Sequence, residues 1–315
     1  MRFTPGTPGP AALYQLLGAA ATLGLLWAAG VLGPAGMVLA MLSPLPAAYV
    51  QMRRGLASGL GVVLLVSGIL WLIDGPGGGL LYLLQFGLAS LILPRFLLRG
   101  QSWDRAIGAT ALIGTLLSVS LLFAYAQYSD QATTEVVSGY IQGELAKVDE
   151  FYQQAELTPT QTEELKALTA GTADYLLAAY PALIMVANSA LLLLVVILLA
   201  RLSQAHYRIP GPPLYLWKAP EVLIWGVILG GFGVFFATGL AQQLSVNLLT
   251  LLLPVYFLQG MAVVAHFFQR RGTAPFLRVL GYMMLVIVNP LPAVVTGIGI
   301  FDLWLDFRNP KEKKT

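Results

Sequence analysis

Residues 175–200 read YLLAAYPALIMVANSALLLLVVILLA, a run of 26 residues without one charged side chain. At about 1.5 Å of rise per residue, a helix of this length crosses the roughly 30 Å hydrocarbon core of a bilayer. Backbone N–H and C=O groups cannot stay unpaired in lipid, so a run of this kind must form a helix. The stretch therefore predicts a membrane-spanning α-helix.

Comparable apolar runs occur along the rest of the chain. They cover residues 11–33, 35–51, 56–73, 79–98, 106–127, 221–240, 246–268 and 276–304. Charged residues make up only 10% of the 315 residues, whereas a soluble domain carries about 25%. None of the runs shows the alternating pattern of a membrane β-barrel strand. The composition predicts an all-α, polytopic transmembrane helical bundle with about eight full spans.

The first run, 11–33, is too long for the apolar core of a cleaved signal peptide, which has roughly 7–15 residues. We therefore expect it to be a retained span. Three parts follow from the pattern: a five-helix N-terminal membrane half over 1–127, a polar insertion over 128–174, and a C-terminal membrane half over 175–315 that ends in a basic tail.

Charge predicts the orientation of these parts. The insertion over 128–174 holds nine acidic residues and only two basic ones, Lys147 and Lys166. The other basic residues lie in the remaining loops and at the two ends of the chain. Because cytoplasmic loops carry an excess of Lys and Arg, those loops and both termini are expected in the cytoplasm, with the insertion on the outer side.

The last apolar run, 276–304, is interrupted by Asn289-Pro290-Leu291-Pro292. Proline removes a backbone donor and disfavours helix at the residue before it. We expect this run to fold back as a Pro-broken hairpin of two short helices, which returns the C-terminus to the cytoplasm. The alternative is one kinked span with an external C-terminus.

The acidic insertion carries a helical stripe of apolar residues. Its members recur every three or four positions: Val137, Ile141, Leu145, Val148 and Tyr152. This spacing predicts an amphipathic helical hairpin on the outer surface. Such a hairpin either extends and caps the bundle or forms a lid over a substrate entrance.

No motif of a known enzyme class is present in the sequence. The glycine-rich stretch over 75–79 lacks the Lys-Ser/Thr pair of a phosphate-binding loop, and no His-Glu-x-x-His motif occurs. The chain has no cysteine, and its two histidines, His206 and His266, are not spaced as ligands on one helix. We therefore expect neither catalysis nor a metal or other cofactor.

Polar residues inside apolar runs are costly, and they are the first candidates for function. The candidates for solute binding are Gln85, Asn188, Asn247, Gln259 and Asn289. Amides of this kind either line a solute cavity or hold helices together through hydrogen bonds.

A second group of candidates lies at the C-terminal end: Asp302, Trp304, Asp306 and Arg308. Asp302 and Asp306 are four residues apart and share a helix face. The group either anchors the chain at the membrane interface or docks a cytoplasmic partner.

The sequence resembles the YybS-like family of bacterial multi-pass membrane proteins. The residues that carry the resemblance are Trp217, Pro220, Asn247, Tyr256, Gln259-Gly260, Pro275, Arg278, Gly299, Asp302, Trp304 and Asp306-Phe307-Arg308. Residues 1–127 are more weakly similar to the substrate-binding subunits of energy-coupling-factor transporters, through Pro44 to Tyr49, Arg53-Arg54-Gly55 and Gln85-Phe86-Gly87. This second resemblance implies a vitamin-like solute and separate ATPase subunits.

Two functions are compatible with these observations. The first is a solute-binding component of a small-molecule, vitamin-like transporter without its own ATPase, with the lipid bilayer, an ATPase and coupling subunits as partners. The alternative is a non-catalytic membrane scaffold or assembly factor for envelope proteins. We expect no nucleic-acid partner, and the location expected is the bacterial cytoplasmic (inner) membrane.

Overall fold

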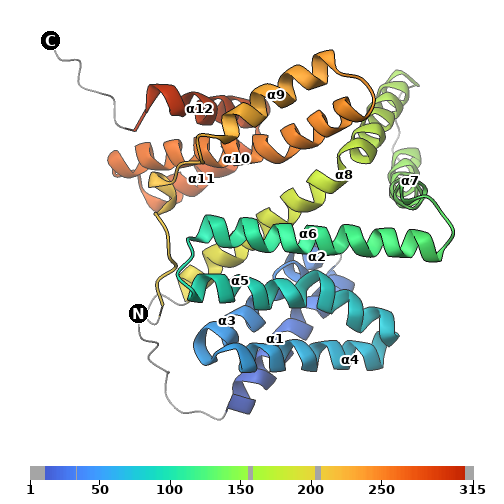
Figure 1. The fold of residues 1–315 in the computed structure, drawn as a ribbon, viewed down its shortest axis with the longest axis vertical. Coiled ribbons are helices and arrows are strands. Elements are labelled where there is room, and N and C mark those ends of the chain that lie inside the picture. The colour runs from blue at the N-terminus through green and yellow to red at the C-terminus, as the bar shows by residue number, and fades with distance from the viewer. Residues whose placement is uncertain (1–10, 33, 155–158, 203–206, 309–315) are drawn as a thin grey trace. The chain divides into compact units, whose positions relative to one another are not determined.

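The computed structural model describes residues 11–32, 34–154, 159–202 and 207–308, which form helices and connecting turns without a strand (Figure 1). The chain divides into two compact units. The first combines residues 1–125 with 187–211, and the second combines 126–186 with 212–315. Residues 187–211 belong to the first unit, so helix α8 (Pro159–Leu202) contributes to both units. The three parts expected from the sequence, 1–127, 128–174 and 175–315, stay a prediction.

The first unit contains the helices of the N-terminal half. They are α1 (Ala11–Leu32), α2 (Pro34–Ala40), α3 (Pro44–Arg54), α4 (Leu56–Tyr82), the π-helical η1 (Leu83–Gly87), α5 (Leu88–Leu98) and most of α6 (Trp103–Tyr128). The run over 35–51, expected as one span, is instead split into α2 and α3. Pro44 and Pro46 stand in the first turn of α3, where proline fits a helix start and interrupts the preceding one.

The chain reverses inside α4, in the glycine-rich stretch between the apolar runs 56–73 and 79–98. Gly75 has φ +77° and ψ −175°, a backbone conformation that glycine adopts without strain. A Cβ atom added to Gly79 would lie 2.6 Å from the carbonyl oxygen of Ser67 and 3.1 Å from the Trp71 side chain. The segment after Gly75 therefore packs back against the segment before it. Residues Leu56–Leu98, although helical almost throughout, therefore form two antiparallel arms (Figure 1).

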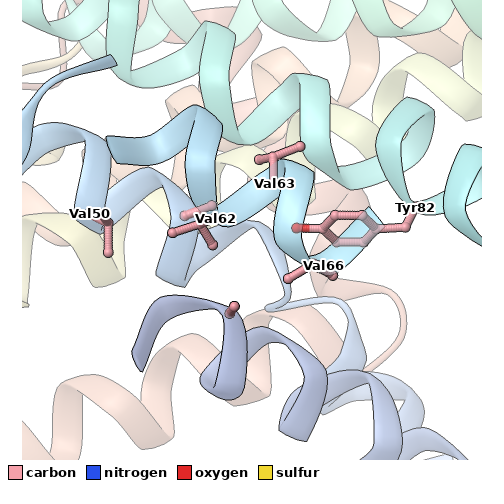
Figure 2. Close-up of a cluster of buried hydrophobic side chains, with 7 residues drawn as sticks. Val50, Val62, Val63, Val66 and Tyr82 are labelled. Carbon is pink, nitrogen blue, oxygen red and sulfur yellow. The ribbon is translucent and has the colours of Figure 1, made fainter. Parts of the chain in front are cut away.

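The core of the first unit lies where α1, α3 and the two arms of α4 meet (Figure 2). Seven buried residues form it: Ala19, Ala47, Val50, Val62, Val63, Val66 and Tyr82. Small and β-branched side chains let the helices approach closely, and the ring of Tyr82 points toward Val66 in Figure 2. Tyr82 on the second arm and Val62, Val63 and Val66 on the first belong to the same buried cluster, which holds the two arms together.

The second unit contains the acidic insertion and the C-terminal helices. These are α7 (Thr133–Gln154), the first part of α8 (Pro159–Leu202), the 3-10 turn η2 (Leu214–Leu216), α9 (Leu223–Phe236), α10 (Leu240–Arg270), α11 (Pro275–Ile287) and α12 (Leu291–Leu305). Helix α7 and the first part of α8 lie within the acidic insertion, and the amphipathic hairpin on the outer surface stays a prediction. Helix α9 has 14 residues and is shorter than the span expected over 221–240.

Helix α9 has two different faces. Gly230 lies on the face packed against α10, where an added Cβ would come within 3.0 Å of the Leu249 side chain. The opposite face carries large apolar side chains, among them Leu229 at 67% exposed and Phe232 at 63%. A large apolar face without cover suits contact with lipid rather than water.

Helices α10 and α12 approach each other through two glycines. A Cβ atom added to Gly260 would overlap the carbonyl of Val295, and one added to Gly299 would overlap the carbonyl of Tyr256. Small residues at a helix contact let backbones approach closely, which is the usual way that helices pack in membranes. This contact fixes α12 in register against α10.

The last apolar run is broken where its prolines predicted a break. Helices α11 and α12 are bent by 101° at the short segment between Ile287 and Leu291. By length and apolar composition, five helices among the described residues can cross a membrane, or six if this bent pair counts as one span. A helical membrane protein is thereby supported. The count of eight spans, the complete hairpin and the cytoplasmic termini stay predictions.

Candidate functional site

A buried polar network lies at the end of α12 in the second unit. The Arg308 Nη2 atom is 2.6 Å from the Asp302 Oδ2 atom, and the two side chains are only 3% and 0% exposed. The Nε2 atom of Gln259, on α10, donates a hydrogen bond of 3.2 Å to the same carboxylate oxygen. Three residues that the sequence analysis singled out in two separate groups therefore belong to one cluster.

Backbone groups extend this network. Arg308 Nη1 donates to the carbonyl oxygen of Trp217 at 2.7 Å, and the Ala219 N–H donates to Gln259 Oε1 at 3.0 Å. The Phe307 N–H donates to Asp302 Oδ1 at 3.2 Å. A buried ion pair depends on hydrogen bonds to its remaining donors and acceptors. Here the two terminal nitrogens of Arg308 are bonded, whereas its buried Nε–H has no hydrogen-bond partner. The network connects three segments through hydrogen bonds: the residues after η2, helix α10 and the end of α12.

The other candidates for partner docking lie nearer the surface. Lys218 Nζ is 2.9 Å from Asp306 Oδ1, and both side chains are partly exposed. Trp304 is 62% exposed. Asp302 and Arg308 thus have their partners inside the unit, whereas Trp304 and Asp306 are accessible from outside. A docking role for this group stays a prediction.

Asn247 on α10 is inserted into the hydrogen-bond ladder of α8. Its Oδ1 atom accepts from the Ala182 N–H at 3.2 Å, and its Nδ2 atom donates to the Ala178 carbonyl at 2.6 Å. These two backbone groups are four residues apart, and an undisturbed helix would pair them with each other. Pro181 lies between them and weakens the helix locally. Asn247 therefore repairs α8 and joins it to α10.

The remaining amides have separate surroundings. Asn188 and Gln85 belong to the first unit, where Asn188 Nδ2 is 3.5 Å from the Thr115 hydroxyl and Gln85 is exposed on the π-helical turn η1. Asn289 is exposed at the break between α11 and α12. Gln259 and Asn247 are bound as described above. A solute-binding role for these five amides stays a prediction, and the hollow described next is formed by other residues.

An open hollow of about 440 Å³ lies between α7, α8 and α10. We call it the α7–α8–α10 hollow. Its polar lining residues are Thr134, Glu135, Ser138, Asp174, Tyr180 and Gln243, and Val137, Leu177 and Ala178 supply apolar surface. All of them belong to the second unit. The hollow lies beside the helices of the acidic insertion, for which the sequence analysis gave a lid over a substrate entrance as one of two interpretations.

Sequence reasoning missed Gln51. Its side chain is 1% exposed, and its Nε2 atom donates to the Leu91 carbonyl on α5 at 2.8 Å. A Cβ atom on Gly59 would lie 2.8 Å from Gln51 Oε1, so glycine at that position leaves room for the amide. The sequence did contain two indications of this contact. Gln51 ends the apolar run 35–51, and the following run contains Gly59.

Comparisons with known proteins identify the family of the chain. A family model described as "Predicted membrane protein (DUF2232)" matches residues 20–303. A search of curated proteins and a search of solved structures each returned no match. The match supports a family of membrane proteins. The resemblances to the YybS-like family and to transporter subunits are not supported by it and stay predictions.

Proposed function

The chain belongs to the family described as predicted membrane protein (DUF2232), and from this premise we propose that it is the solute-binding component of a small-molecule transporter. The solute would be small and vitamin-like, and separate ATPase and coupling subunits would supply the energy. The proposed location is a bacterial inner membrane, with the acidic helices α7 and α8 on the outer side.

The observation that carries the proposal is the α7–α8–α10 hollow. Its volume of about 440 Å³ falls within the range of roughly 300–1,000 Å³ that is usual for small-molecule sites. It combines hydroxyl, amide and carboxylate groups with apolar side chains on three helices, as such sites do. The charge pattern predicts that this end of the second unit lies outside the membrane, where an imported solute arrives first.

The network around Asp302 supports the same proposal in a different way. A solute-binding component needs a rigid frame around a site, and the buried ion pair with Arg308 supplies one. Lys218 and Trp304 lie close in sequence to residues of this network and have accessible side chains. Under the positive-inside rule this end faces the cytoplasm, where coupling subunits would bind.

Native mass spectrometry of the protein purified in mild detergent tests the proposal. We expect a co-purified small molecule, and an ATPase with a coupling subunit when the complex is kept intact. The variant Ser138→Trp fills the hollow from α7 and should abolish the bound solute. Gly139→Trp adds the same bulk at the next residue, where an added Cβ meets no atom within 4 Å, and should retain it.

Two results would contradict the proposal. One is a solute that remains bound in Ser138→Trp, because the site would then lie elsewhere. The other is a protein that carries no solute and co-purifies with envelope or cytoskeletal proteins. That second result would favour the scaffold or assembly factor, for which the exposed Trp304 would be the natural contact.

A further inference from the structure

The α7–α8–α10 hollow has an unbalanced charge. Glu135 enters its lining from α7 and Asp174 enters from α8, and no Lys, Arg or His is among its lining residues. The surrounding insertion over 128–174 adds to the imbalance, with nine acidic residues against two basic ones. A concave surface lined by one sign of charge concentrates ligands of the opposite sign. The hollow therefore disfavours anions and attracts cations.

The carboxylates are accompanied by groups that suit an organic ammonium. Tyr180 is also a lining residue, and an aromatic ring is a group to which a cation can bind through a cation–π contact. Leu177 and Val137 provide apolar surface for a carbon skeleton, and the Gln243 amide is an acceptor or donor on the third helix. An ammonium group needs acceptors and negative charge, and its carbon skeleton needs apolar contact. The hollow supplies both.

A metal ion fits the lining less well. No group of three or more His, Cys, Asp or Glu side chains able to hold a metal occurs among the residues that the structure describes. Calcium takes six to eight oxygen ligands, and two carboxylates alone do not provide them. Glu135 is also partly engaged, because its Oε2 atom accepts a hydrogen bond of 3.1 Å from the Ala132 N–H at the start of α7. An organic cation requires fewer and less regular ligands.

We propose that the α7–α8–α10 hollow binds a small amine-bearing organic cation, with Glu135 and Asp174 neutralising its charge and Tyr180 packing against it. This assignment rests on the proposed function, and it narrows the solute to one chemical class. It also gives the acidic insertion a role: the insertion supplies the α7 wall of the site and attracts the solute to it.

The probes for the test are choline and its neutral isostere 3,3-dimethylbutan-1-ol, which has nearly the same shape and lacks the charge. Tyramine and 4-propylphenol form a second such pair. Binding of each probe to the protein in lipid nanodiscs would be measured by isothermal titration calorimetry at low ionic strength. We expect both cations to bind at least about tenfold more tightly than their neutral partners, and to bind more weakly as salt is added.

Two isosteric variants test the assigned residues. Glu135→Gln and Asp174→Asn remove one charge each, and the amide introduced by Glu135→Gln keeps a side-chain oxygen for the Ala132 N–H. Each variant should weaken choline binding about tenfold and leave 3,3-dimethylbutan-1-ol unchanged. The control Glu163→Gln removes a charge from an exposed residue of α8 that does not line the hollow, and should have little effect.

Equal binding of charged and neutral probes would overturn the assignment, as would unchanged choline affinity in both isosteric variants. The proposed function fails differently. A neutral or anionic solute that co-purifies with the protein and is lost in Ser138→Trp would keep the transporter component and reject the cation. If the protein binds the cation probes but never co-purifies with an ATPase or a solute, the cation site would stand and the transporter component would be rejected.

Discussion

Asp302 and Arg308, six positions apart in the sequence, form a buried ion pair at the end of α12, with 2.6 Å between Oδ2 and Nη2. Asp302 is the last acidic residue within the helix, and Arg308 lies beyond the left-handed turn at Asp306. After this turn the Arg308 side chain reaches back to the Asp302 carboxylate on α12. A pair this deeply buried makes each partner dependent on the other.

Breaking this pair from one side should cost more than removing it whole. Asp302→Leu or Arg308→Leu leaves an uncompensated buried charge, and each should destabilise the protein by about 3–5 kcal/mol. The double variant should lose less than either single variant. Thermal unfolding in nanodiscs would measure the three effects. If the loss of stability in the double variant equals the sum of the losses in the two single variants, the two charges do not depend on each other.

The exposed pair between Lys218 and Asp306 provides the matched comparison. Its nitrogen–oxygen distance of 2.9 Å is close to that of the buried pair, but the two side chains are 48% and 34% exposed. Solvent screens exposed pairs, so Lys218→Met should cost no more than about 1 kcal/mol. The same unfolding assay applies, and a loss as large as that of Arg308→Leu would contradict the argument from burial.

Replacing Asn247 by leucine should destabilise the contact between α8 and α10. The change leaves the Ala182 N–H and the Ala178 carbonyl without their side-chain partner, and about 1–2 kcal/mol should be lost. Gln242→Leu is the control, because that residue makes one exposed bond to the Val234 carbonyl. Hydrogen exchange measured by mass spectrometry should show faster exchange around Pro181 in Asn247→Leu alone.

The glycine contact between α10 and α12 should tolerate no side chain. Gly299→Leu would overlap the Tyr256 carbonyl and the α10 backbone, and should cost about 3 kcal/mol or prevent folding. Gly297→Leu places the same side chain on α12 where an added Cβ meets no atom within 4 Å, and should be mild. The yield of monodisperse protein and its unfolding temperature distinguish these outcomes.

The buried phenol of Tyr207 should make the folded protein less stable in alkali. It lies outside the apolar spans, donates a hydrogen bond of 2.6 Å to the Leu97 carbonyl, and burial raises its pKa to about 12 from the usual 10. Between these values the unfolded chain has released the phenolic proton and the folded chain retains it, so stability falls as pH rises. Tyr207→Phe should lessen this fall between pH 10 and 12. An unchanged pH profile would contradict the assignment.

The helical membrane character of the chain could be predicted because it depends on local composition. The turn at Gly75 and the break near Pro290 were also predictable, since glycine and proline act on their own backbone. The division of 35–51 and the shortness of α9 were not. Apolar length permits a span without requiring one, and the way neighbouring helices pack decides where each helix ends.

The candidate site was predictable only as separate pieces. Gln259, Asp302 and Arg308 were noticed because polar residues are rare in this chain, but 43 residues separate the first two, and their contact depends on the crossing of α10 and α12. The α7–α8–α10 hollow was less accessible to sequence reasoning. Its lining residues lie on three helices that are far apart in the sequence, and no local pattern shows which faces come together.

The shortness of α9 has a consequence for the lipid around the second unit. At about 1.5 Å per residue its 14 residues reach roughly 21 Å, whereas the hydrocarbon core is about 30 Å thick. Helix α10, packed beside it, has 31 residues and exceeds that thickness. Bilayers adjust to such hydrophobic mismatch by local thinning. The exposed Phe232 and Leu229 face of α9 should therefore adjoin a thinned patch of bilayer, and membrane thickness itself becomes a factor in where this protein resides.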